Sequence, residues 1–147
     1  MKGFTEKRFF EPVEVGHYEK ERLLGFIREI LSSRNDKIIF AYVHGSFIKS
    51  KTFRDIDVGL FVEGKGDFYL ESDISAELTA AVGFEVEVKV LNDAPVPFQM
   101  AVLRDGILLF SRDEMRRGAF IEKTGRLYME YSHFRNIFLE IDGVRQG

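Results

Sequence analysis

The sequence predicts an α/β (α+β) fold with a mixed sheet, helices packed on one face and further helices at the C-terminal end. Three patterns in the 147 residues carry this prediction: an amphipathic helical segment at 17–33, an apolar run at 37–43, and strict alternation of apolar and charged residues at 84–91. Helical and strand periodicities that alternate along a chain are typical of a sheet covered by helices.

The first half of the chain is expected to form one long helix and two strands. Helix 17–33 has apolar side chains three and four residues apart, namely Leu23, Phe26, Ile27, Ile30 and Leu31. Segment 37–43 (KIIFAYV) is almost entirely apolar, which favours a strand buried on both faces. Segment 55–62 (DIDVGLFV) is expected to be the next strand, after a short helix that begins near residue 46.

A helix and the clearest strand of the chain follow. Helix 72–82 is expected to begin at Ser72 as its N-cap, and its inward side chains are Ile74, Leu78 and Val82. Segment 84–91 (FEVEVKVL) alternates with a period of two residues, as a half-buried strand does. Its apolar face carries Phe84, Val86, Val88 and Val90, and its polar face carries Glu85, Glu87 and Lys89.

The C-terminal part is expected to be mostly helical. A turn at 92–95 (NDAP) ends the preceding strand, a short helix covers 97–104, and 106–110 (GILLF) forms a further strand. Residues 111–114 (SRDE) have the spacing of a capping box that begins a helix, and Gly125 is expected to interrupt it. A second helix then carries an apolar stripe, interpreted as core or oligomer surface: Leu127, Tyr128, Tyr131, Phe134, Ile137, Phe138 and Ile141.

Composition excludes several classes of protein. The 21 basic and 24 acidic residues give a net charge of −3, so no general affinity for nucleic acid is expected. The chain has no cysteine, which excludes disulfides, thiolate metal sites and cysteine nucleophiles. No apolar stretch is long enough to span a bilayer, and the charged N-terminus lacks the apolar core of a signal peptide. We therefore expect a cytoplasmic protein with one domain over 1–147.

Two carboxylates on one strand indicate a metal site. Asp55 and Asp57 lie two residues apart and therefore share one strand face, about 6.6 Å apart at Cα. Neighbouring carboxylates repel each other unless a cation lies between them. Paired divalent ions are a standard arrangement for phosphoryl and nucleotidyl transfer, and Mg²⁺ prefers such oxygen ligands.

Two further features point to the same site. Gly45 and Ser46 directly follow the buried strand, so that a glycine backbone, the next amide and a hydroxyl can approach phosphate oxygens. Glu87 lies on the polar face of its strand. If that strand pairs beside 55–62, its carboxylate joins the two aspartates.

These motifs together resemble those of a known family. Gly-Ser, a short loop, Asp-x-Asp on a strand and a third acid on a later strand are similar to the polymerase-beta-type nucleotidyltransferases, and above all to their minimal nucleotidyltransferase (MNT) branch. The resemblance covers AYVHGSFIKSKTFRDIDVGLFV, VEVKVLNDAP and the ILLFSRDE turn. It implies a polymerase-beta-like nucleotidyltransferase fold, with a catalytic core at 1–110 and a C-terminal helical extension at 111–147.

The resemblance also implies an activity and its residues. Gly45 and Ser46 would hold the triphosphate of ATP or another nucleoside triphosphate. Asp55 and Asp57 would bind two Mg²⁺ ions together with Glu87, which takes the third-acid position and assists deprotonation of an acceptor hydroxyl. MNT proteins are commonly partnered with HEPN-domain toxins, which makes adenylylation of a HEPN tyrosine, in an antitoxin role, the leading expectation.

Alternatives remain beside this interpretation. The third acid is usually Asp, and the residue before the first Asp is often Ser, where this chain has Glu87 and Arg54. The acceptor hydroxyl can instead belong to a small molecule, or the protein can be a non-catalytic module that neutralises a partner by contact; self-association is left open. His44 is expected to be packed or hydrogen-bonded rather than a base, and the cations Lys49, Lys51 and Arg54 are expected to be a solvated loop.

Overall fold

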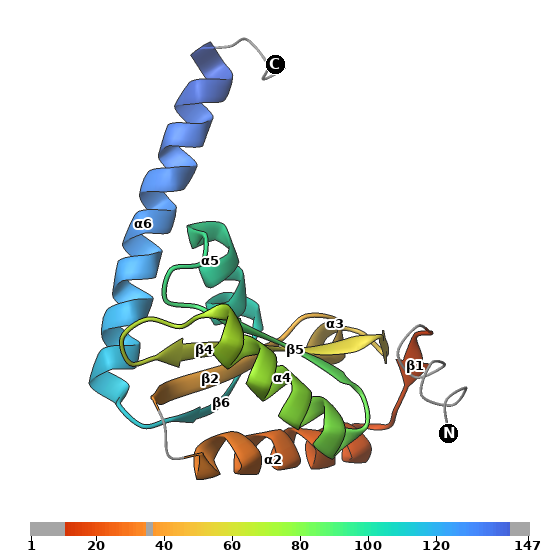
Figure 1. Cartoon of the computed structure of the whole chain (residues 1–147). Helices are drawn as coiled ribbons and strands as arrows, with labels where there is room; N and C mark the ends of the chain where they lie inside the picture. The colour runs from red at the N-terminus through yellow and green to blue at the C-terminus, as the bar shows by residue number, and fades with distance from the viewer. Residues whose placement is uncertain (1–10, 35–36, 142–147) are drawn as a thin grey trace.

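The computed structural model of the chain describes residues 11–34 and 37–141, so the charged segment 1–10 lies outside the described residues. Figure 1 shows a sheet with helices on both sides and one helix that extends away from it. The elements are β1 Val13–Glu14, α2 His17–Ser33, β2 Ile38–His44, α3 Ser46–Lys49, β3 Thr52–Phe53, β4 Asp55–Val62, α4 Phe68–Val82, β5 Glu85–Val90, α5 Val96–Asp105, β6 Ile107–Ser111 and α6 Glu114–Ile141.

The main sheet is mixed, as the sequence predicts. Its four strands lie in the order β5-β4-β2-β6, and β1 and β3 form a separate two-stranded sheet. Strand β2 is antiparallel to both β4 and β6, whereas β4 and β5 are parallel. Because the two parallel strands begin at the same edge, the residues at their starts lie side by side.

One face of the sheet is covered by α2 and α4 (Figure 1). The inward side of β4 is Ile56, Val58 and Leu60, all fully buried. The predicted inward residues of α4 and β5 pack against them, and all but Val90, which is partly buried, are buried. Helix α2 has the predicted bounds, but its Phe26 is 44% exposed and Leu24 is buried in its place. The 3.6-residue period turns Phe26 to the edge of the apolar stripe, where it lies beside Arg22.

Helix α4 begins one turn earlier than expected. Its N-cap is Asp67, whose carboxylate accepts a hydrogen bond from the backbone N–H of Leu70 at 2.8 Å. Ser72, the expected N-cap, lies inside the helix and is exposed. An aspartate caps a helix at least as well as a serine, and the extra turn lets Leu70 pack against the core.

The other face of the sheet is covered by α5 and the first half of α6. Phe40, Tyr42, Leu91, Val102 and Phe120 form a second buried cluster there. The expected capping box at Ser111 is replaced by a cap two residues later, because Ser111 still belongs to β6. Asp113 accepts a hydrogen bond from the backbone N–H of Arg116 instead.

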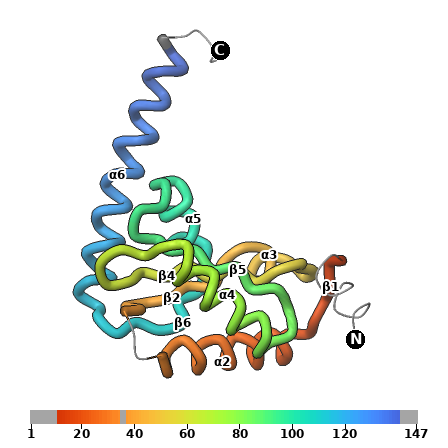
Figure 2. The backbone as a smooth tube through the Cα atoms, viewed as in Figure 1, coloured from red at the N-terminus to blue at the C-terminus, as the bar shows by residue number. Residues whose placement is uncertain are grey.

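Helix α6 is continuous, so the predicted break at Gly125 is wrong. A glycine inside a helix costs only about 1 kcal/mol, and here its neighbour Thr124 is buried, with 1% of its surface exposed. The second half of the helix extends beyond the rest of the chain (Figure 2). Its apolar stripe is therefore largely exposed, at Tyr131, Phe134, Ile137 and Phe138; the side chain of Ile141 lies outside the described residues. Among the helices described, none has the length and hydropathy needed to cross a membrane.

Candidate active site

Three carboxylates meet where β4 and β5 begin. Asp55 and Asp57 are the first and third residues of β4, and the parallel register places Glu87 of β5 directly beside Asp57. One carboxylate oxygen from each of the three residues lies within 4.8 Å of the others. The expectation that Glu87 joins the two aspartates if its strand pairs beside 55–62 is confirmed. We call these three residues the acidic cluster.

The acidic cluster holds unbalanced negative charge. Burial, and after it the negative charges of Asp55, Glu87 and Glu85, raises the pKa of the Asp57 carboxyl to about 7. Lys89 lies 3.9 Å from Glu87, but both side chains are more than half exposed, so this contact relieves little of the repulsion. Carboxylate oxygens within 4.8 Å of one another fit a hard divalent cation such as Mg²⁺.

A glycine turn places a backbone against Asp57. Gly45 has φ +82°, a conformation that favours glycine, and a Cβ built there would lie 2.3 Å from Oδ2 of Asp57. The cause is the antiparallel register, which pairs His44 with Asp57 and so carries the chain directly over the carboxylate. Ser46 follows at the start of α3 and is exposed. Gly45 and Ser46 thus border the acidic cluster.

The short helix α3 is held by Lys20, a residue of α2. Nζ of Lys20 donates hydrogen bonds to the carbonyl oxygens of Phe47 and Ser50, both at 2.7 Å. These carbonyls lie at the C-terminal end of α3, where a cation is favourable. The contact joins residues about thirty positions apart, and no local pattern could have indicated it.

Near the acidic cluster, one histidine is packed against an aromatic ring, one lysine is ion-paired and two further basic side chains are exposed. His44 is half-buried against Phe98, with ring centroids 5.4 Å apart, and burial lowers its pKa; it is packed, as expected. Lys49 lies 3.2 Å from Asp105 of α5, which ties α3 to the end of that helix. Lys51 and Arg54 are exposed.

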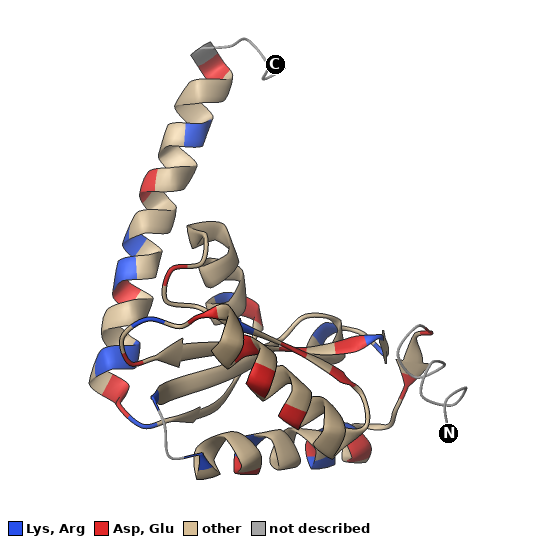
Figure 3. Ribbon diagram, in the orientation of Figure 1, with Lys and Arg blue, Asp and Glu red and all other residues tan. Residues whose placement is uncertain are grey.

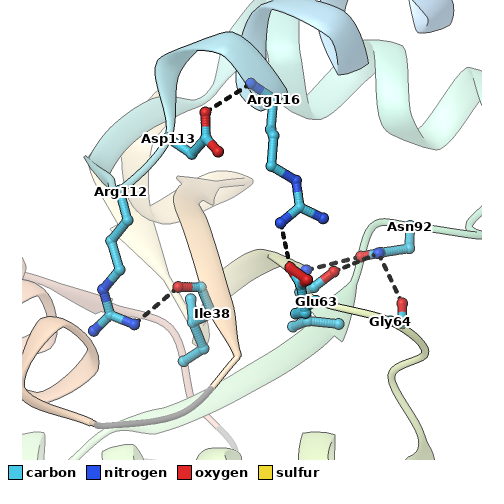
Figure 4. A network of polar contacts seen from close by, with 8 residues as sticks. Ile38, Glu63, Gly64, Asn92, Arg112, Asp113 and Arg116 are labelled. Carbon is cyan, nitrogen blue, oxygen red and sulfur yellow. Dashed lines mark hydrogen bonds and ion pairs between the residues drawn. The ribbon is translucent and has the colours of Figure 1, made fainter.

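Asn92 does more than form the expected turn. Its side chain accepts a hydrogen bond from the N–H of Val62 at 3.0 Å and donates to the carbonyl of Val62 at 2.8 Å, so it extends the pairing of β4 by one position. Figure 4 shows Asn92 in this network, together with the ion pair between Arg116 and Glu63. The network fixes the end of the sheet that lies opposite the acidic cluster.

A known protein family and several solved structures match this chain. The family model described as "Polymerase beta, Nucleotidyltransferase" matches residues 26–115. That segment contains the acidic cluster, Gly45 and Ser46. A comparison with curated proteins finds no match to this chain.

Solved structures share the fold at low sequence identity. A chain in the crystal structure of the toxin-antitoxin MntA-HepT has a TM-score of 0.68 and 20% identity, over 84% of this chain and 97% of that one. A chain in a complex of a tri-AMPylated Shewanella oneidensis HEPN toxin with MNT antitoxin gives 0.69 and 21%, over 85% and 98%. A chain of a toxin-antitoxin with AMP-PNP gives 0.70 and 22%, over 82% and 97%.

Proposed function

Because the chain belongs to the polymerase beta nucleotidyltransferase family, we propose that it transfers AMP from ATP to an acceptor hydroxyl. The observation that carries the proposal is the acidic cluster, with carboxylate oxygens within 4.8 Å of one another and the Gly45 turn directly against it. Carboxylates gathered beside a glycine turn are suited to hold a metal–triphosphate, since the turn lets phosphate approach the backbone closely.

Each residue has a role in the proposed reaction. Gly45 and Ser46 bind the triphosphate, and the acidic cluster holds Mg²⁺. The acceptor oxygen forms a bond to the α-phosphorus, the bond from that phosphorus to the bridging oxygen breaks, and pyrophosphate leaves. Glu87 assists removal of the proton from the acceptor hydroxyl. Divalent cations bound at such a site lower the pKa of the attacking hydroxyl and neutralise charge on the leaving group.

For the acceptor, we propose a tyrosine of a HEPN-domain partner protein, which would make this chain an antitoxin. The proposal is supported by the fold shared with an MNT antitoxin in complex with a tri-AMPylated HEPN toxin, and with a chain of a toxin-antitoxin with AMP-PNP. Glu87 and Ser46 are exposed, so a hydroxyl presented by another macromolecule can reach them. The exposed apolar stripe of α6 is the kind of surface that marks protein interaction sites.

The direct test is incubation of the purified protein with Mg²⁺, ATP labelled on its α-phosphate, and a co-expressed HEPN-domain partner. We expect label on the partner, on a tyrosine. Label on small molecules of a lysate, with none on the partner, would show that the acceptor is a small molecule. No label on any acceptor would exclude transferase activity and leave only a non-catalytic binding module.

The two glutamates of β5 provide a matched pair for this assay. Glu87 and Glu85 lie two residues apart on the same polar face, but only Glu87 belongs to the acidic cluster. Glu87→Gln is expected to slow transfer strongly while ATP affinity changes little, and Glu85→Gln is expected to have the smaller effect on rate. Equal effects of the two variants would contradict the assigned role of Glu87.

A further inference from the structure

A cavity lies on the same face of the sheet as the acidic cluster, at the opposite end. Its volume is about 630 Å³, and it is bordered by the loop after β4, the loop after β5, α5 and α6. Phe61 of β4 lines it, four residues beyond Asp57 and therefore about 13 Å from it along the strand. Between them, Gly59 is buried under Leu91. The cavity is thus separate from the acidic cluster.

Two buried polar side chains line the cavity with unused hydrogen-bonding capacity. Gln99 is 6% exposed and Thr124 is 1% exposed. The amide nitrogen of Gln99 donates to the carbonyls of Leu91 at 2.7 Å and Asn92 at 3.3 Å, which leaves its Oε1 as a free acceptor. Neither this oxygen nor the Thr124 hydroxyl bonds to any residue of 11–34 or 37–141. Among the described residues, the fully buried side-chain atoms without a hydrogen-bond partner are Nε2 of His44 and Oγ of Ser111. The oxygens of Gln99 and Thr124 are therefore accessible, and a ligand in the cavity can reach them.

The rim of the cavity is basic. Lys65 and Lys123 line it and are exposed, and within the described ranges neither forms an ion pair with a carboxylate. Arg116 also lines it but is paired with Glu63. Asp93 is the acidic residue among the lining side chains, so the positive charge exceeds the negative. Figure 3 shows basic and acidic residues together along the lower turns of α6, and of these Arg116 and Lys123 line the cavity.

The wall beneath the rim is aromatic. Phe61 and Phe120 lie with ring centroids 5.0 Å apart, and Phe61 is only partly buried, so part of it remains available to a ligand. Cavities of roughly 300–1,000 Å³ with an apolar lining and a few converging polar groups are typical of small-molecule sites. A ligand that uses all of these features combines an aromatic ring, a hydrogen-bond donor and an anionic group.

We propose that this cavity binds a nucleoside monophosphate, at a site distinct from the acidic cluster. The base lies against Phe61 and Phe120, and its exocyclic amine donates a hydrogen bond to Oε1 of Gln99. The phosphate is held at the rim by Lys65 and Lys123. Thr124 contributes its hydroxyl to the polar edge of the ligand. Nucleoside monophosphates carry all three features within the size of this cavity.

The test is calorimetric titration of the full chain with AMP in the presence of EDTA, so that metal-dependent binding at the acidic cluster does not contribute. We expect binding in the micromolar to millimolar range. Adenosine, which lacks the anion, and inorganic phosphate, which lacks the ring, are each expected to bind at least about tenfold more weakly. Failure of AMP to bind at millimolar concentration would overturn the proposal.

Substitutions in the cavity and outside it test where AMP binds. Lys123→Gln and the isosteric Thr124→Val are each expected to weaken AMP binding about three- to tenfold, with melting curves that show a folded protein. Arg126→Gln is the matched control, because Arg126 is on the same helix and pairs with Glu122 outside the lining residues. AMP binding that is lost in Asp57→Asn but unchanged in the cavity variants would place the nucleotide at the acidic cluster instead. Equal loss in Arg126→Gln would also contradict the assignment, since it would indicate unspecific charge attraction.

Discussion

The two ends of one sheet face differ in charge and in the elements that carry that charge. At the start of β4 and β5, three carboxylates lie within 4.8 Å of one another, whereas at the far end Lys65 and Lys123 border a cavity. The acidic end is built from strand residues, whose spacing is set by the register. The basic end is built from loops and from α6. One sheet face thus has an acidic end suited to cations and an opposite, basic end suited to anions.

The largest expected effect is at the acidic end. Asp55→Asn and Asp57→Asn each remove a proposed ligand without changing side-chain volume, and each is expected to lower the rate of nucleotidyl transfer at least about a hundredfold. The measurement is label transfer from ATP, with circular dichroism to confirm the fold. Arg126→Gln, which lies at neither site, is expected to transfer at the rate of the unmodified protein. Wild-type rates in both aspartate variants would show that the acidic end is not the site of nucleotidyl transfer.

The second prediction compares the effect on stability of alanine at two glycines, one beside the acidic cluster and one in α6. Gly45→Ala is expected to destabilise the fold by about 1–3 kcal/mol, since the positive φ is strained for alanine and the new Cβ would lie 2.3 Å from Asp57 Oδ2. Gly125→Ala is the control, because a Cβ there meets nothing within 4 Å and α6 gains up to about 1 kcal/mol of helix propensity. Thermal unfolding measures both. A Gly45→Ala variant as stable as wild type would contradict the close approach.

Much of this architecture could be predicted from periodicity. The alternation at 84–91 determines which side of β5 is buried, and the spacing of Asp55 and Asp57 places both on the polar face of β4. Strand bounds and the inward residues of α4 follow from the same local rules. Because of this periodicity, the sequence predicts that Asp55, Asp57 and Glu87 lie on one face of the sheet, provided that the two strands pair.

The remaining features depend on contacts between distant segments. Gly125 predicts a break because glycine has a low helix propensity. The helix continues because the burial of the neighbouring Thr124 outweighs that local preference. The role of Lys20 depends on carbonyls some thirty residues away. The cavity takes its lining from β4, two loops, α5 and α6, so no single stretch of sequence contains its pattern.

A third prediction concerns the triphosphate. Ser46 is exposed at the start of α3, beside the Gly45 turn, and its hydroxyl is expected to donate a hydrogen bond to a charged phosphate oxygen. Ser46→Ala should therefore lose about 1.5–3 kcal/mol of binding free energy for Mg·ATP. Ser50→Ala, at the other end of α3, is the control and should retain the affinity. Calorimetry with Mg²⁺ present measures both, and an unchanged affinity in Ser46→Ala would place the triphosphate elsewhere.

The smallest expected effect is on stability in the absence of metal. The Asp57 carboxyl has a pKa of about 7 in the folded protein, against its ordinary value of 3.8. Between these pH values the folded state binds more protons than the unfolded state, so this group lowers the stability of the fold as the pH rises. Above about pH 7 its contribution is constant. Asp57→Asn lacks the ionisable group and should lack this loss.

The melting temperatures of wild type and Asp57→Asn, compared in EDTA from pH 4.5 to 8, measure this loss directly. Because Asp57 is only half-buried, solvent screening reduces the effect to about 1 kcal/mol, or about 2–4 °C. The variant should melt near the wild-type temperature at pH 4.5 and above it at pH 8. Mg²⁺ with ATP should reverse the order at pH 8, since it stabilises only a protein that binds it. A variant that melts well below wild type at every pH would show that the Asp57 side chain stabilises the fold itself, and would contradict its role as a cation ligand.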